Sequence, residues 1–308
     1  MQKAQGALEY LLLIGGAILV AVIVIALILN IGGSSEEETY LATAHALCAK
    51  YPPQECSLNA VTVKGREYLC FSYGPNTCRA ASGLIAWYRL NENTSGTNQP
   101  IFDNTKNHQD GYITGPQVDC TVQGQFNSTA CSFSGGFTGN MIRLNYSAIN
   151  PKPIDNIDNA DSFSISAWIY PTQNLVYYEG IIGKDYGDSW LLSAGETAAG
   201  TSYTGGSNNS LGFYVAGTRI SSAANSIPLN TWTHVAGTFD GSVKTIYING
   251  TQVGTQAVSV NMQSGTYWIN IGGNGSGDEW KGKLDEITVW NRALTPIEVC
   301  ALAGKTNC

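Results

Sequence analysis

Acidic and amide side chains gather between residues 103 and 110, at a spacing that suits metal binding. Asp103 and Asp110 stand at the two ends of this segment, with Asn104 and Asn107 between them. Ca²⁺ takes about six to eight oxygen ligands, mostly from carboxylates and from main-chain carbonyls of a tight loop. We therefore predict a structural Ca²⁺ here. The alternative is that both aspartates make Asx turns before Gly111.

Catalytic chemistry has less support in the sequence. A glycosidase needs two carboxylates that converge on one face, about 5–9 Å apart. Asp285 and Glu286 are adjacent in a predicted strand, and adjacent strand residues point to opposite faces. His234 has no Ser or Cys nucleophile in a recognisable motif and fits a hydrogen-bonded strand position. We therefore predict no enzyme, with a tethered carbohydrate-active enzyme as the less favoured alternative.

The eight cysteines all lie beyond residue 47. None forms a C-x-x-C pair and the chain has three histidines, so the sequence does not indicate a zinc or redox site. An even number of cysteines suggests disulfides in an extracytoplasmic compartment. The pairing stays open; we predict sequence-local closure, with a crossed arrangement of the first four as the alternative. The local bonds are Cys48 with Cys56, Cys70 with Cys78, Cys120 with Cys131, and Cys300 with Cys308.

N-glycosylation sequons point to the same compartment. Six of them lie beyond residue 90, and in an exported chain such sites carry glycans on surface loops. A chain rich in Asn, Ser and Thr also produces sequons by chance, so we expect only some to be modified. Their asparagines are Asn93, Asn127, Asn145, Asn208, Asn249 and Asn274.

Charge and composition narrow the function. The chain has 308 residues, a formal net charge of −7 and only 13% charged residues. A nucleic-acid-binding protein carries clustered basic residues, and no such cluster is present in the sequence. We therefore predict no nucleic-acid partner. The length allows one large domain and smaller appended segments.

The N-terminal segment is suited to a membrane. Residues 10–29 contain no charged side chain, and twenty helical residues span about 30 Å, the thickness of the hydrocarbon layer. A secretory signal has a shorter apolar core of about 7–15 residues. Glu9, at the start of the apolar run, is also unusual for such a signal.

The sequence KAQGALEYL at residues 3–11 resembles the class III signal peptide of archaeal type IV pilin-like proteins. This resemblance implies that a prepilin peptidase cuts between Ala4 and Gln5, leaving residues 1–4 as a leader and residues 5–33 as a hydrophobic helix. It also implies a filament core in which Glu9 pairs with the terminal amine of Gln5 in a neighbouring subunit, because a buried carboxylate needs a partner. A plain membrane anchor and a removed signal peptide are the alternatives.

Residues 34–82 read as a small connector. Ser35 and Glu38 form a capping box, which predicts a helix over residues 36–49 that ends before two prolines. Residues 60–71 then read as a short hairpin. A unit of this size is too small for a hydrophobic core of its own, so we expect the disulfides to stabilise it.

Beyond residue 83 the pattern is that of an all-β domain. Short runs of β-branched and aromatic residues alternate with turns rich in Gly, Asn and Ser, which predicts an antiparallel sandwich. Ile246 and Ile248 share one strand face, and Asn249-Gly250 predicts a tight turn after them. The fold class is therefore mainly β, with a long N-terminal helix and a disulfide-stapled connector.

Several motifs in residues 83–308 resemble, in order, the laminin-G-like, concanavalin-A-like jelly roll; residues 115–150 do not match. The resemblance places Asp285 beside the predicted Ca²⁺ loop and implies carbohydrate or protein binding. Trp168 and Trp232 lie within the family's core motifs, whereas we expect a group of three tryptophans to be freer to serve a surface. The matching motifs are GLIAWYRL, FDNTKNHQDG, FSISAWIYP, IIGK, WTHVAGTFDG, IYING and GKLDEITVWNRALTPIE. The three freer tryptophans are Trp190, Trp268 and Trp280.

Taken together, these features predict an exported, pilin-like filament subunit at the cell surface. Its helix is inserted in the membrane before assembly and then packs with copies of itself or with other pilins, while the jelly roll mediates adhesion or binds glycans or proteins. The alternative is a singly anchored surface protein that does not polymerise. The ligand-binding residues are not identified at this stage.

Overall fold

The computed structural model describes most of the connector and of the β domain. The predicted leader and hydrophobic helix, with Ala4, Gln5 and Glu9, lie outside the described residues, as do Cys56, Cys308 and Asn127. Among the described residues, no helix has the length and apolar character that a bilayer crossing requires. The described residues are 39–51, 60–72, 78–80, 82–105, 107–126, 128–136, 139–145, 153–176, 178–184, 189–195, 208–259, 262, 268–274 and 278–305.

The connector combines a helix with a small antiparallel sheet. Residues 39–48 are helical, and the sheet has the order β1-β2-β3, formed by Ala60–Val63, Arg66–Ser72 and Cys78–Ala80. The predicted hairpin is the β1–β2 pair. Lys64 and Gly65 have positive φ angles of 52° and 76°, as a type I′ turn requires.

The disulfides of the connector correct the predicted local pairing. Cys48, at the end of the helix, is bonded to Cys70 on the central strand, and Cα atoms 5.5 Å apart allow the bond. The predicted pairs Cys48–Cys56 and Cys70–Cys78 are therefore wrong. The helix packs across the sheet, which brings together cysteines that are 22 residues apart. This bond belongs to the crossed alternative; Cys78 and Cys300 are also disulfide-bonded.

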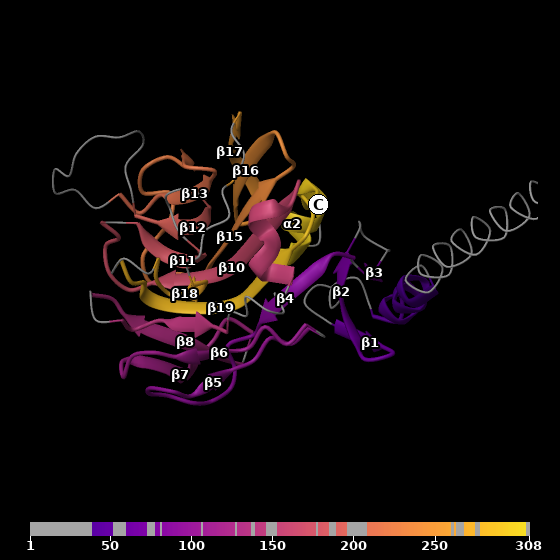
Figure 1. Ribbon diagram of the computed structural model, residues 1–308, viewed down its shortest axis with the longest axis horizontal. Coiled ribbons are helices and arrows are strands. Elements are labelled where there is room, and N and C mark those ends of the chain that lie inside the picture. Colours follow the sequence, from indigo (N-terminus) through magenta and orange to yellow (C-terminus); the bar gives the residue numbers. More distant parts are fainter. Residues whose placement is uncertain are drawn as a thin grey trace, which may run out of the picture.

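Within the described residues, the β domain is a sandwich of two eight-stranded sheets (Figure 1). The first sheet follows the order β17-β16-β15-β10-β19-β8-β7, and β4 also pairs with β19. Its strands are β4 (Leu84–Tyr88), β7 (Val118–Gln123), β8 (Thr129–Ser134), β10 (Phe163–Pro171), β15 (Thr233–Phe239), β16 (Val243–Ile248), β17 (Thr251–Ala257) and β19 (Lys281–Trp290).

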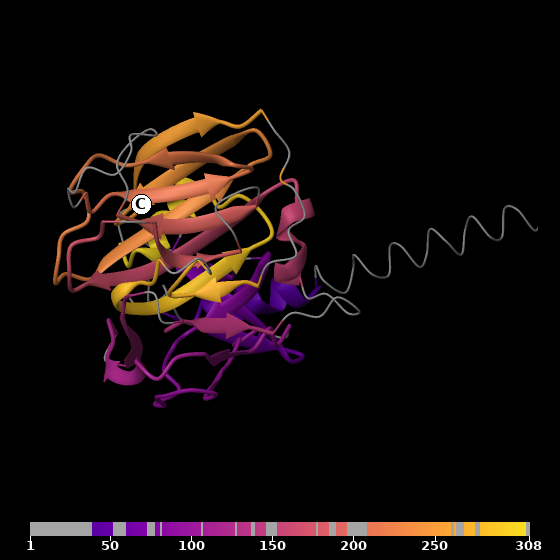
Figure 2. The same ribbon diagram turned by 60° about the vertical axis from the view of Figure 1, so that its left-hand side comes forward.

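The second sheet lies against one face of the first and follows the order β14-β13-β12-β11-β18-β9-β6-β5. Figure 2 shows the strands running side by side across the molecule. The strands of the second sheet are β5 (Pro100–Ile101), β6 (Gly111–Ile113), β9 (Ile142–Leu144), β11 (Glu179–Gly183), β12 (Trp190–Ala194), β13 (Leu211–Val215), β14 (Thr218–Ser221) and β18 (Asn270–Ile271).

Alternating side chains fill the space between the sheets. On β10, Phe163, Ile165, Ala167 and Ile169 belong to the main hydrophobic cluster, while Trp168 lies on the opposite, outer face. Burying apolar side chains from both sheets in one layer is the main source of stability in such a fold. The predicted turn after Ile248 is also present, with positive φ at Asn249 and Gly250.

The described residues between 115 and 145, a segment for which the sequence analysis found no family motif, extend both sheets. β7 and β8 form a hairpin beside β19, and β9 pairs with β6 and β18 in the second sheet. The predicted bond between Cys120 and Cys131 links β7 to β8 and is confirmed. The segment is thus part of the sandwich.

A buried ion pair fixes the only described 3-10 helix, η2 (Pro153–Asn159), to the sandwich. The Lys184 ammonium contacts the Asp158 carboxylate, whose other oxygen accepts a hydrogen bond from Ser189. Both charged side chains are almost fully buried. Removing either partner of such a pair is strongly destabilising, because the remaining charge would be left unpaired in the interior.

The outer face of the first sheet is covered at one end. Helix α2 (Pro296–Leu302) begins with a capping box made by Thr295 and Glu298 and packs on Trp290. Leu69 of the connector joins the same cluster, and Figure 1 shows the connector on the opposite side of the first sheet from the second sheet. Chain segments from both ends of the described structure therefore seal this part of the face.

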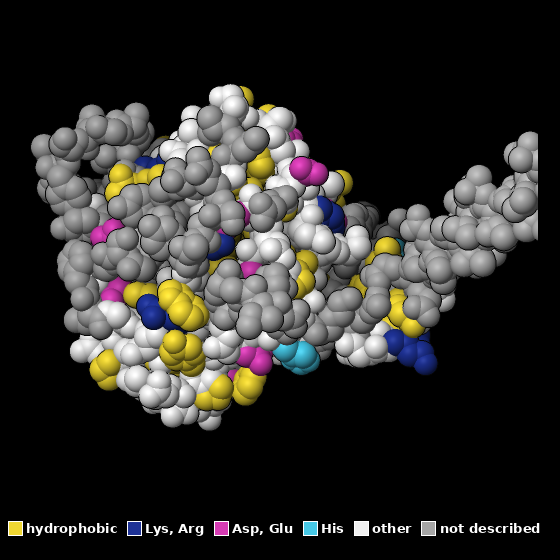
Figure 3. Space-filling view, in the orientation of Figure 1, with side chains coloured by type: hydrophobic (Ala, Val, Ile, Leu, Met, Phe, Trp, Pro, Cys, Tyr) yellow, Lys and Arg dark blue, Asp and Glu magenta, His cyan; other side chains and the backbone are white. Residues whose placement is uncertain are grey.

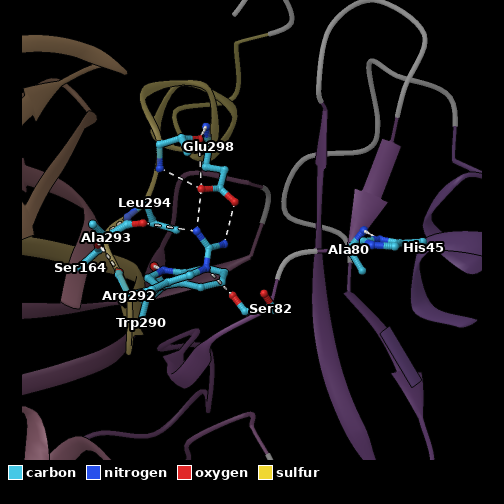
Figure 4. Close-up of polar contacts among 11 residues, drawn as sticks. His45, Ala80, Ser82, Ser164, Trp290, Arg292, Ala293, Leu294 and Glu298 are labelled. Carbon is cyan, nitrogen blue, oxygen red and sulfur yellow. Dashed lines mark hydrogen bonds and ion pairs between the residues drawn. The ribbon is translucent and has the colours of Figure 1, made fainter. Parts of the chain in front are cut away.

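Arg292 ties these segments together (Figure 4). Its guanidinium donates hydrogen bonds to both carboxylate oxygens of Glu298, at 2.8 and 2.6 Å, and to the main-chain carbonyl of Ser82, at 2.9 Å. Gly83 has a φ of +85°, and a Cβ there would lie 2.7 Å from Asn291 Oδ1. The chain therefore enters the β domain in close contact with the loop before α2.

Candidate functional site

The outer face of the second sheet carries a row of side chains that neither α2 nor the connector covers. Pro100, Tyr112, Arg143 and Asn270 are successive partners across β5, β6, β9 and β18. Their neighbours along these strands, such as Ile142 and Ile271, point into the core. The alternation of strand side chains therefore directs the whole row outward. We call this row, together with Trp268, the platform.

Arg143 and Trp268 are the chemically distinctive pair of the platform. The Arg143 guanidinium lies 5.5 Å from the Trp268 ring centroid, and the indole keeps 44% of its surface exposed. Asn270, which is buried, accepts from Arg143 Nε at 3.5 Å and donates to the Trp268 carbonyl at 3.2 Å. An exposed ring beside a held cation can stack on a sugar and bind its polar groups.

Surface charge elsewhere is dispersed. On the face drawn in Figure 3, acidic and basic side chains of the described residues are scattered between polar and hydrophobic ones. Lys283 also lies 5.1 Å from the ring centroid of half-buried Tyr170, but its ammonium donates to the Gln123 carbonyl. The platform therefore differs from this second pair, in which the ring is half-buried and the ammonium is bound to a main-chain carbonyl.

The predictions for the three tryptophans expected at the surface have different outcomes. Trp268 is exposed, as expected of a surface-serving residue, but Trp190 and Trp280 are fully buried and the predictions for them are wrong. Trp190 packs against Phe163 in the core, and Trp280 belongs to the same cluster. Trp168 is buried, as its place in a core motif implied. Their positions depend on which sheet face they occupy, which composition does not reveal.

The sequons also divide by exposure. Asn93 and Asn145 are exposed, and Asn145 follows β9 on the platform face, across from Trp268. Asn249 is exposed as well, although its side-chain oxygen accepts from His234 N. Asn208 and Asn274 are buried. A glycan needs an asparagine amide that faces solvent, so we expect modification at the first two sites.

The predicted Ca²⁺ residues do not form an oxygen cage. Both Asp103 carboxylate oxygens accept hydrogen bonds, from Trp87 N, Thr105 and Gln109 N. Burial raises the pKa of Asp103 above its usual range despite these donors. Asp110 accepts from Asp103 N, and the Asn107 amide donates to the Ile85 carbonyl. Asp103 thus makes an Asx turn with Thr105, as the alternative expected, whereas the Asp110 contact with Asp103 N is not an Asx turn.

Asp285, the fourth predicted ligand, is held elsewhere. One of its oxygens accepts from Gln125 N at 2.9 Å, in the turn of the β7–β8 hairpin. Among the described residues, no group of three or more His, Cys, Asp or Glu side chains is placed to hold a metal ion. The described carboxylates therefore do not form a group of metal ligands, and we derive no role for a metal.

The carboxylates of Asp285 and Glu286 do not follow the predicted alternation. A register shift in β19 accompanies a φ of 47° at Glu286, whose carboxylate accepts from Trp87 Nε1 at 2.6 Å on the outer face. Asp285 pairs in register with Trp168 on that same face. The prediction of opposite faces is wrong, because a bulge interrupts the period of two. Both side chains are buried, so the pair is closed to a saccharide.

Sequence reasoning also missed a buried polar cluster around Trp168. Its register partners on either side are His234 and Asp285, and Phe126 covers it with ring centroids 5.4 Å apart. Burial lowers the pKa of His234 to about 3. Burial, with the Glu286 charge as a smaller cause, raises the pKa of Asp285 to about 8. Both groups are therefore largely uncharged at neutral pH.

Comparison with known families agrees with this geometry. Residues 144–300, just over half of the chain, match the model of the concanavalin A-like lectin/glucanases superfamily, and the chain belongs to that family. Residues 2–28 match the class III signal peptide, which indicates export to the cell surface. No curated protein matches the chain.

Solved structures show the same fold. Domain 4 of AbnA, a GH43 extracellular arabinanase from Geobacillus stearothermophilus in complex with arabinotriose, is 21% identical, with a TM-score of 0.52 over 72% of this chain and 98% of that domain. The binding domains of Paraclostridial Mosquitocidal Protein 1 and of botulinum neurotoxin serotype D are 19% and 16% identical, with TM-scores of 0.51 and 0.50. This chain aligns with 52% and 51% of those two chains, about half of their length.

Proposed function

We propose that this protein is a pilin-like surface subunit whose jelly roll binds carbohydrate at the platform. The exposed Trp268 indole beside Arg143 is the observation that carries the proposal. Sugars bind to proteins through an aromatic ring that covers their apolar face and through polar groups that fix their orientation. The platform supplies both from adjacent strands.

The comparisons support binding as the role of the β domain. Its family is named for lectins as well as glucanases, and similar solved structures are described as binding domains or were solved with an oligosaccharide. Likeness at this level of identity supports the fold alone. The choice of binding over catalysis rests on the open platform and on the burial of the Asp285–Glu286 pair.

Binding of immobilised oligosaccharides by the full chain in detergent tests the proposal. Trp268→Ala should abolish binding, because the stacking surface is lost. Ile297→Ala is the matched control: this side chain is also 44% exposed but belongs to α2. Loss of binding in both variants, or in neither, would refute a carbohydrate site on the platform.

The class III signal peptide supports processing by a prepilin peptidase and assembly into a filament. Sequencing the mature N-terminus tests the first step, and Gln5 is the expected first residue. A retained Met1 would favour a singly anchored protein that does not polymerise. A Glu9→Ala variant should be processed but assemble poorly, because the carboxylate no longer pairs with the terminal amine of a neighbour. Normal filaments from this variant would refute the pairing.

A further inference from the structure

Arg143 differs from four other cations of the β domain, which contact carboxylates. Arg292 is paired with Glu298, Lys184 with Asp158 and Lys281 with Glu179. Arg89 approaches Glu286. Among the described residues, Arg143 has no acidic partner; its Nε contacts Asn270 and its guanidinium lies over Trp268. The two terminal nitrogens keep their donor capacity.

In the part of the chain that the structure describes, no ion pair compensates the charge of Arg143. Tyr112, Asn270 and Pro100 occupy the rest of the row and none carries a charge. Asp110, which precedes β6, is the nearest acidic residue along this strand; its carboxylate accepts a hydrogen bond from Asp103 N, and no ion pair joins it to Arg143. An arginine that is held by a buried amide and faces an open surface is already oriented, so less entropy is lost when it binds an anion.

A planar guanidinium matches one ligand group best. A carboxylate accepts two parallel N–H hydrogen bonds from arginine, which a neutral hydroxyl does not match. In a saccharide this group belongs to an acidic sugar such as a uronic acid. Its ring can lie against Trp268 while its carboxylate meets Arg143, since both side chains belong to the same small surface.

We propose that the platform selects acidic saccharides, with Arg143 binding the carboxylate and Trp268 supporting the sugar ring. This inference rests on the proposed function, because it names the class of saccharide for the same site. It is unexpected from the net charge of −7, which would on its own repel anionic ligands. The Arg143 cation on the platform determines the preference instead.

A pair of ligands with the same sugar rings, one with ionised carboxylates and one with neutral esters, tests the proposal. The probes are trigalacturonic acid and its trimethyl ester. The protein is the full chain in detergent, produced without N-glycans so that Asn145 is unmodified. Calorimetry should show that the acid binds at least about tenfold more tightly than the ester. Arg143→Gln should reduce this ratio to near one, and Arg143→Lys should restore part of it.

The outcomes separate the two levels of the proposal. Equal affinity of the wild-type chain for acid and ester, with Trp268→Ala abolishing both, overturns the acidic preference and leaves the carbohydrate site intact. No binding of either probe, together with no binding in the immobilised-oligosaccharide experiment, overturns both. An unchanged ratio in Arg143→Gln, in a variant whose near-ultraviolet circular dichroism matches the wild type, assigns the preference to another group and overturns the role of Arg143.

Discussion

The two outer faces of the sandwich are built from the same alternation of side chains and have different surroundings. On the first sheet, Trp290 is fully buried beneath α2 and the connector residue Leu69. On the second sheet, Trp268 remains exposed beside Arg143. Trp290, on β19, is therefore a packing residue, whereas the indole of Trp268, just before β18, keeps part of its surface exposed. The face to which the connector attaches is covered at this end, and the opposite face is the one on which we propose a ligand site.

The largest effect that tests this comparison comes from truncating the two tryptophans. Trp290→Ala should lower the free energy of unfolding by about 3–5 kcal/mol, because it leaves a cavity under α2. Trp268→Ala should change it by less than about 0.5 kcal/mol, as surface substitutions usually do. Chemical denaturation of both variants measures the difference. Similar losses in the two would mean that the faces are not distinct.

A second prediction concerns Asp285 on the covered face. Its folded pKa of about 8 lies above the unfolded value of about 3.9, so the folded state holds a proton that the unfolded state releases. Stability from this group is greatest below pH 4 and decreases by up to about 1.4 kcal/mol per pH unit until about pH 8. Asp285→Asn should flatten this dependence.

Urea denaturation of wild type and Asp285→Asn at several pH values between 4 and 9 measures the effect as a difference between two curves. Other titrating groups contribute to both curves and cancel. Parallel curves would show that Asp285 is ionised in the folded protein. Asp240→Asn is a useful comparison, since main-chain donors lower the pKa of that carboxylate, which is almost fully exposed.

Glycan occupancy should follow the exposure of the sequons. Peptide mass spectrometry of protein purified from the surface of the cells that naturally produce it should find glycans at Asn93 and Asn145 and none at Asn208 or Asn274. Stability should change little when exposed sites are altered, since surface substitutions act within about 0.5 kcal/mol. A glycan at buried Asn274, whose amide donates to Asp278, would contradict the described packing.

The smallest expected effect is that of a chelator. The Asp103 oxygens are occupied by protein donors, so adding EDTA should leave the melting temperature unchanged. Differential scanning calorimetry with and without added CaCl₂ measures this directly. A fall in melting temperature on chelation, reversed by calcium alone, would restore the metal site that the acidic spacing predicted.

Period-two patterns and turn residues were enough to predict the sandwich. The Asn249-Gly250 and Lys64-Gly65 turns form as local backbone preferences require. Contacts between distant segments were not predictable in this way. Cys48 meets Cys70 because a helix packs on a sheet, and Glu286 departs from alternation because of a bulge. The platform depends on register across four strands, and a single sequence gives no signal for that register beyond aromatic and basic residue types.

The contact that Arg292 makes with Ser82 has a mechanical consequence. A load on the connector reaches the chain beside Arg292 and passes into β4, which is hydrogen-bonded to the ten-residue strand β19. A load on the platform enters through β9 and β18 in the other sheet. Tension between a bound ligand and the connector would therefore cross the hydrophobic layer of the sandwich, and the whole core would resist it.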